Sequence, residues 1–153
     1  MIPDGHEALD TDRVQVPRPA GRDAPPASAT FELAVERSPG GPKTARDGIR
    51  RWLVELACPR DFVDDITLIV SELVTNAIVH ADSPARLTAE LHAGCLRLVV
   101  DDTSSAPPAV RALGQGVGGY GLRLLATMAD GWGWTTTPAG KQVWSEFAVP
   151  GYR

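Results

Sequence analysis

A long amphipathic helix between about Asp61 and Ala81 is the feature that most constrains this fold. Apolar side chains recur there at intervals of three and four residues, which places them on one helix face: Phe62, Ile66, Ile69, Leu73 and Ala77. A helix with one apolar face must cover another layer, and strand-like segments lie on both sides of it in the sequence. We therefore expect an α+β fold: a two-layer α/β sandwich with a mostly antiparallel mixed sheet and helices on one face.

The remaining elements are predicted from residue periods and turn signals. Phe31, Leu33 and Val35 alternate with other residues and indicate a half-buried strand. Ser38 is expected to cap the next helix, with Pro39 at its first position. The pattern further predicts a hairpin from residues 85–92 and 95–102, a helix over about 119–129, and strands near 132–137 and 142–149.

The length of 153 residues fits a single domain. Residues 1–28 carry five prolines among scattered charges, so we expect a disordered tail before a domain spanning 29–153. The net charge of −4 argues against nucleic acid as the main partner. Neither a signal peptide nor an apolar run of membrane-spanning length is visible, which predicts a cytoplasmic protein without membrane association. Cys58 and Cys95 are expected to be reduced thiols.

Glu72, Asn76 and His80 form a polar row within the long helix. They are spaced four residues apart and therefore share one helix face. Many of their neighbours are strongly apolar, so a carboxylate and a carboxamide there need either solvent or a bound partner. A carboxylate can deprotonate a nucleophile, and an amide oxygen is a hard ligand that suits Mg²⁺. The spacing alone favours the simpler interpretation, which is the solvent-exposed face of an amphipathic helix.

Asp102 ends the second strand of the predicted hairpin. Because side chains alternate along a strand, it shares a face with Leu96, Leu98 and Val100. An inward carboxylate at a strand end suits a hydrogen bond from a buried donor, such as an exocyclic amine. The simpler interpretation is an aspartate that begins a turn. Asp101 competes for the same assignment, and the strand alternation favours Asp102.

Glycines crowd the segment before the third predicted helix: Gly114, Gly116, Gly118, Gly119 and Gly121. Backbone amides without a neighbouring Cβ can approach phosphates closely, and a helix N-terminus adds a favourable dipole. A flexible loop is the alternative. Three of these glycines match the pattern G-x-G-x-x-G of dinucleotide-binding enzymes. That pattern belongs to a doubly wound sheet, for which too little chain remains, so we reject an oxidoreductase.

The order of these features resembles one ATPase superfamily. A polar helix face, a strand ending in aspartate and a glycine-rich loop before a helix follow one another in the gyrase, chaperone, histidine kinase and mismatch-repair ATPases, which share the Bergerat fold. Within that superfamily, residues 30–149 resemble the stand-alone anti-sigma factor serine kinases. The matching segments are SELVTNAIVHA at 71–81 (the N box), GGYGL at 118–122 (the second glycine box), and ADGWG at 129–133 with GKQVW at 140–144 (the C-terminal strands).

The resemblance implies a catalytic residue and two ligand contacts. Glu72 would be the general base that activates the acceptor hydroxyl. Asn76 would coordinate Mg²⁺, and Asp102 would bind the amino group of adenine. The implied cofactors are therefore ATP and Mg²⁺.

The second glycine box would surround the phosphates. The resemblance implies that the backbone of Gly119 and Gly121 holds them, with Gly118 and Leu122 beside these residues in the nucleotide site. His80 would line or support the site.

Three positions depart from the family pattern, two of them in the first glycine box. The first glycine box of the family is Asp-x-Gly-x-Gly, whereas residues 102–106 are Asp-Thr-Ser-Ser-Ala, so both glycine positions carry side chains. Related chains often have threonine where Gln142 follows the Gly-Lys turn, near the base. The segment between the two glycine boxes, from Ala106 to Gly118, is also short.

Two functions follow from the resemblance. The first is an ATP-dependent serine/threonine-protein kinase and anti-sigma factor, which phosphorylates a small antagonist protein in bacterial transcription or stress signalling. The second is a non-catalytic ATP-binding module that sequesters a sigma factor or another regulator. The implied partners are a sigma factor and its antagonist, and the family also suggests a homodimer.

Overall fold

Five antiparallel strands form one layer of the structure, a computed structural model that describes residues 26–108 and 120–152. The strands lie side by side in the order β1-β2-β3-β5-β4. Their bounds are β1 Ser28–Val35, β2 Ala85–His92, β3 Cys95–Asp102, β4 Gly131–Thr137 and β5 Gly140–Ala148. The helices are α1 Gly41–Glu55, α2 Arg60–Thr75 with the π-helical turn η1 Asn76–His80, and α3 Tyr120–Met128.

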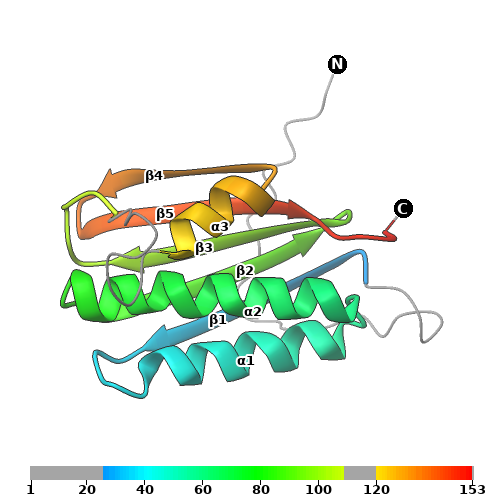
Figure 1. The fold of residues 1–153 in the computed structure, drawn as a ribbon, viewed down its shortest axis with the longest axis horizontal. Coiled ribbons are helices and arrows are strands. Elements are labelled where there is room, and N and C mark those ends of the chain that lie inside the picture. The colour runs from blue at the N-terminus through cyan, green and yellow to red at the C-terminus, as the bar shows by residue number, and fades with distance from the viewer. Residues whose placement is uncertain (1–25, 109–119, 153) are drawn as a thin grey trace.

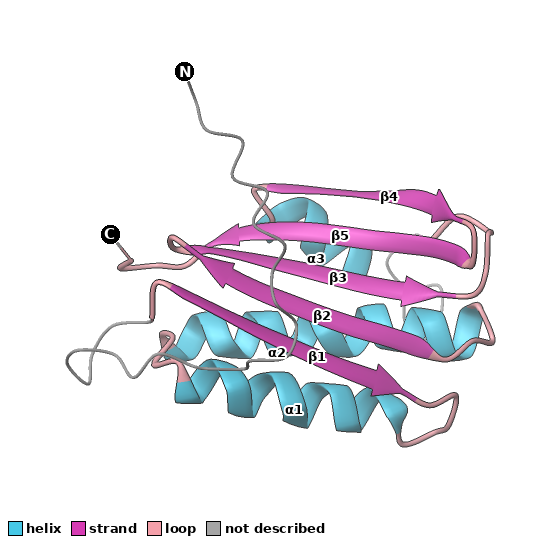
Figure 2. Ribbon diagram, turned by 180° about the vertical axis from the view of Figure 1, so that it is seen from behind, coloured by secondary structure: helices cyan, strands magenta, loops and turns pink. Residues whose placement is uncertain are grey.

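The helices form the second layer and cover one face of the sheet (Figures 1 and 2). α2 packs against α1 and against α3. Its buried side chains face those of the sheet, where Leu87, Leu91, Leu96 and Leu98 are almost fully inaccessible. Burial alternates along β2 and β3 as predicted, because successive side chains of a strand point to opposite faces. The predicted α+β sandwich with helices on one face is confirmed.

The strand directions follow from the number of helices in each connection. α1 and α2 form a pair that returns the chain to the end of the sheet where β1 stopped, so β2 runs antiparallel to β1 (Figure 1). The single helix α3 is followed by the β4–β5 hairpin, and β5 therefore pairs antiparallel with β3. Every strand pair within the described residues is antiparallel, so the expected mixed component does not occur in this part of the chain.

The start of α1 differs from the prediction. Ser38 does not cap the helix, and Pro39 is not its first residue. The Gly41 amide donates to the Ser38 carbonyl, so Ser38 belongs to a turn that precedes the helix. α1 begins at Gly41 with Gly40 as its N-cap, which makes no side-chain cap hydrogen bond. A Cβ on Gly41 would lie 2.4 Å from the Ile78 side chain, so the first turn of α1 packs closely against η1.

The other predicted elements are present with shifts of a few residues. The 85–92 and 95–102 hairpin is confirmed, and the long predicted helix corresponds to α2 and η1. Among the helices in the described ranges, none combines the length and the apolar character that a membrane crossing requires.

Candidate functional site

A cavity lies between the C-terminal part of α2, the ends of β3 and β5, and the first turns of α3. Three residues predicted for the site line it: Asn76, Asp102 and Leu122. Apolar side chains, among them Leu73 and Val143, form much of its remaining wall. The structure therefore brings together residues that are distant in the sequence, in the arrangement that the order of motifs predicted.

A π-helical turn ends the helix beside this cavity. The amide of Ala81 donates to the Asn76 carbonyl over 3.0 Å, an i to i+5 hydrogen bond. Short π-helical turns are rare and are frequent at functional sites, because they change the direction in which side chains leave the helix. The turn covers Asn76–His80, so the backbone of His80 lies at its end. The predicted supporting role of His80 stays a prediction.

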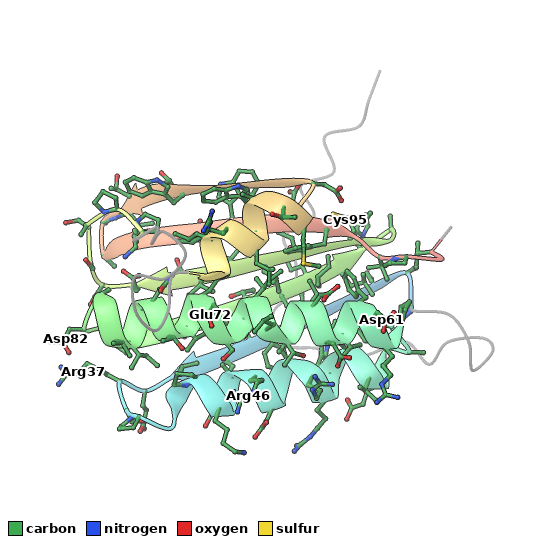
Figure 3. The ribbon with its side chains drawn as sticks, viewed as in Figure 1. Arg37, Arg46, Asp61, Glu72, Asp82 and Cys95 are labelled. Carbon is green, nitrogen blue, oxygen red and sulfur yellow. The ribbon has the colours of Figure 1, made fainter. Side chains whose placement is uncertain are left out.

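Glu72 and Asn76 carry buried polar atoms without partners. Glu72 Oε2 and both amide atoms of Asn76, Oδ1 and Nδ2, are inaccessible and have no hydrogen-bond partner among the described residues. Glu72 lies on α2 (Figure 3), and the sequence places it one helical turn before Asn76. A buried polar group without a hydrogen bond costs about 1–3 kcal/mol, so this pair favours a state in which something else supplies the partners.

Unpaired buried atoms also occur elsewhere, at Trp52 Nε1 and Ser145 Oγ. These two belong to residues that do not line the cavity, whereas Asn76 does. The combination of unpaired polar atoms and an adjacent cavity therefore distinguishes Asn76 from incidental unpaired groups, and Glu72 lies one helical turn before it. Both residues are partly exposed, but these polar atoms are out of reach of solvent, unlike those of a fully solvent-exposed helix face.

Asp102 is buried and paired with a lysine. Its Oδ2 lies 2.7 Å from Lys141 Nζ, and the two side chains are 4% and 6% exposed. Its Oδ1 accepts a hydrogen bond of 2.8 Å from the Ser104 amide. Lys141, which also lines the cavity, was not predicted as a site residue. Its proximity depends on the register of β3 and β5, which pairs residue 102 with residue 141, and no local signal in the sequence contains that information.

Asp101 and Gln142 lie on the other face of the sheet. Gln142 Nε2 donates to Asp101 Oδ1 over 2.8 Å, and these two residues are paired in the β3–β5 register. The preference for Asp102 over Asp101 as the inward carboxylate is therefore confirmed. Gln142 does not line the cavity, because alternation along β5 directs Lys141 and Val143 to it instead.

Comparison with known families identifies the domain. The sequence model of the family described as "Histidine kinase-like ATPase domain" matches residues 36–147. The chain belongs to this family. The match covers all the residues that line the cavity and supports the resemblance inferred from the sequence motifs.

A solved structure shares the fold of this histidine kinase-like ATPase domain. It contains the RsbU and RsbW domains of Rv1364c from Mycobacterium tuberculosis and superimposes with a TM-score of 0.62 at 18% sequence identity. The similarity covers 78% of this chain and 32% of that chain, so the domain spans about a third of the protein that it matches. Among curated proteins, none matches this sequence significantly.

The altered first glycine box of this ATPase domain is held by side-chain hydrogen bonds. The Thr103 amide and hydroxyl lie 2.8 Å from Ser83 Oγ, and the Ala106 amide donates to Ser104 Oγ. Within the described ranges, the non-glycine residues with positive φ are Ala57, Asp82 and Ala93, so none of residues 103–106 has a positive φ. Side chains at the two former glycine positions are therefore compatible with this loop, since neither position requires a left-handed backbone.

Part of the second glycine box lies outside the described residues. This applies to Gly118 and Gly119, as well as to Gly114 and Gly116. Gly121 lies in the first turn of α3, and the neighbouring Leu122 is buried and lines the cavity. The predicted phosphate contacts of this segment remain predictions.

The oxygen atoms near the cavity fit a magnesium ion that also binds the phosphates of a nucleotide. Within the described residues, no group of three or more His, Cys, Asp or Glu side chains could hold a metal ion. Mg²⁺ is usually bound by one or two protein oxygens together with water and substrate phosphates, so a single unpaired amide oxygen such as Asn76 Oδ1 is sufficient on the protein side. The residues present therefore fit ATP with Mg²⁺.

Proposed function

We propose that this domain binds ATP with Mg²⁺ and acts as a regulatory serine/threonine-protein kinase and anti-sigma factor. Its substrate would be a serine of a small antagonist protein in bacterial transcription or stress signalling. One observation carries the proposal: Glu72 and Asn76 hold buried polar atoms without partners, and Asn76 lines the cavity that Asp102 also reaches. A carboxylate and an amide oxygen one helical turn apart are the groups that phosphoryl transfer needs.

Each residue has a separate task in this proposal. The Glu72 carboxylate accepts the proton of the attacking serine hydroxyl. Asn76 Oδ1 would hold Mg²⁺, which would supply positive charge to neutralise the phosphates. Asp102 accepts a hydrogen bond from the adenine amine through a carboxylate that Lys141 and Ser104 already hold in place. Little covalent chemistry is asked of the protein, because phosphoryl transfer depends mostly on positioning and electrostatics.

The protein partners are inferred from similarity. The N box of residues 71–81 resembles that of the anti-sigma factor kinases, and the shared fold with a structure containing an RsbW domain is in accord with this. We therefore propose a sigma factor and an antagonist protein as partners, and a homodimer as the assembly.

A second function is favoured by the pairing of Asp102. Because its carboxylate already has a cationic partner, the buried charge does not depend on a nucleotide. The domain would then act as a module that sequesters a sigma factor or another regulator, and bound ATP would stabilise the competent state without being consumed.

Two measurements test the proposal. Calorimetry should detect micromolar binding of ATP in the presence of Mg²⁺ and a large loss of affinity in Asn76→Ala. Proteins captured from the native cell should then be incubated with the domain and radiolabelled ATP. Transfer of label to a serine supports the kinase. Binding without transfer favours the sequestering module, and the absence of any heat with ATP and Mg²⁺ would overturn both.

A further inference from the structure

The ion pair between Lys141 and Asp102 differs from every other ion pair in the described parts of the chain. Both of its side chains are less than one-tenth exposed, whereas the side chains in the other pairs are at least 39% exposed. Removing two charges from water costs more than their attraction usually returns, so a buried pair is seldom explained by stability alone. Its place in the cavity wall suggests a role in recognition.

The pair retains unused hydrogen-bonding capacity, and both of its residues line the cavity. A lysine ammonium has three protons, and its ion-pair partner among the described residues is the single oxygen Asp102 Oδ2. A carboxylate has about four acceptor positions, of which Asp102 uses one for Ser104 and one for Lys141. The cavity wall therefore presents a hydrogen-bond donor directly beside an acceptor.

We propose that Lys141 is a specificity-determining residue for the nucleobase. Its ammonium donates a hydrogen bond to the ring nitrogen N1 of adenine, while Asp102 accepts one from the neighbouring exocyclic amine. This proposal rests on the ATP binding proposed above. The Watson–Crick edge of adenine presents a donor beside an acceptor, which complements the acceptor and donor of the ion pair. Leu73, Val100 and Val143 line the same cavity and suit the apolar faces of a base.

The backbone around Lys141 is closely packed against the end of β3. Residue 141 pairs with residue 102 across the β3–β5 ladder, and the preceding Gly140 lies against the backbone of residues 102 and 103. A Cβ on Gly140 would come within 2.1 Å of the Asp102 carbonyl oxygen. The Lys141 side chain consequently begins at a defined point of the backbone, and the ion pair with Asp102 holds its ammonium.

The test compares nucleotide analogues on the unmodified full-length chain. Calorimetry with Mg²⁺ would measure the affinities of ATP, of 1-deaza-ATP, which has C–H in place of N1, and of 7-deaza-ATP as a control. We expect 1-deaza-ATP to bind about 10- to 100-fold more weakly than ATP, because a buried charged donor loses its acceptor. The affinity of 7-deaza-ATP should stay within about threefold of that of ATP, since N7 lies on another edge of the base.

A paired variant removes the proposed recognition while keeping the fold. Lys141→Met alone would leave the Asp102 carboxylate buried without its cation, so the variant tested combines Lys141→Met with Asp102→Asn. We expect the paired variant to bind ATP and 1-deaza-ATP with equal affinity. The matched control is Lys43→Met, which changes the other lysine of the chain, an exposed residue paired with Asp47. This control should keep the full preference for ATP.

The outcomes separate the two proposals. Equal binding of ATP and 1-deaza-ATP to the unmodified chain would overturn the role of Lys141 and leave ATP binding intact. Binding of GTP as tight as that of ATP would also overturn it, because the same ion pair would then contact a guanine edge. A failure of all three adenine nucleotides to bind would overturn ATP binding itself, and the role of Lys141 with it.

Discussion

Replacing Asn76 with leucine should stabilise the ligand-free domain and abolish its response to ATP. In the structure both amide atoms of Asn76 are buried without a hydrogen-bond partner among the described residues. Leucine is similar in size and has no polar atoms, so the substitution removes a desolvation penalty of about 1–3 kcal/mol. We therefore expect the free energy of unfolding to rise by about that amount, which corresponds to an increase in Tm of about 3–5 °C per kcal/mol for a domain of this size.

Urea unfolding without nucleotide measures the first effect, and thermal unfolding with ATP and Mg²⁺ measures the second. A ligand present at 100 times its Kd stabilises the native state by about 2.7 kcal/mol. The unmodified domain should show this gain, and Asn76→Leu should lose most of it, because the variant has no oxygen for the metal. Asn76→Leu would thus raise the stability of the ligand-free domain and remove its response to the ligand.

Thr67→Val is the matched control on the same helix. Thr67 is also buried, but its hydroxyl donates to the Val63 carbonyl over 2.6 Å, so its polar atom is satisfied. We expect this variant to be unchanged or up to about 1 kcal/mol less stable, and to keep its response to ATP. The reasoning is refuted if Asn76→Leu is less stable than the unmodified domain, or if its Tm still rises with ATP and Mg²⁺ by the full amount.

Three further predictions concern catalysis, backbone packing and thiol reactivity. Glu72→Gln should keep the affinity for ATP and Mg²⁺ within about threefold and lower transfer of radiolabelled phosphate by about 100-fold or more, as expected for loss of a general base; an unchanged transfer rate would exclude that role. Gly140→Ala should lower the free energy of unfolding, measured in urea, by about 1–3 kcal/mol, because its Cβ would overlap backbone atoms. In the control Gly131→Ala the nearest atom to the new Cβ is 3.6 Å away, so the free energy of unfolding should change by less than about 0.5 kcal/mol. Burial raises the pKa of Cys58 to about 11, so its reactive thiolate is scarce at pH 8 and increases about tenfold per pH unit toward that value. Iodoacetamide should therefore label the exposed Cys95 well before Cys58 in the folded protein, as mass spectrometry of the peptides would show.

The helices and strands, and the side of each that faces the core, could be predicted from residue patterns alone. The apolar repeat of α2 and the alternation along β2 and β3 are local patterns, and they predicted both the two-layer fold and the inward direction of Asp102. The four-residue spacing also placed Glu72 and Asn76 on one turn of the helix. Each of these properties depends on backbone periods of 3.6 and 2 residues, which a chain carries before it folds.

The partners and the burial of these side chains could not be predicted from the sequence, because they depend on how the elements pack. The partner of Asp102 is Lys141, because the register of two strands brings residues 102 and 141 together, and neither segment specifies that register alone. The unpaired state of the Asn76 amide depends on burial by neighbouring elements. Whether a polar atom is buried and whether it has a hydrogen-bond partner depend on contacts between distant segments. These properties are therefore set only when the segments have packed together.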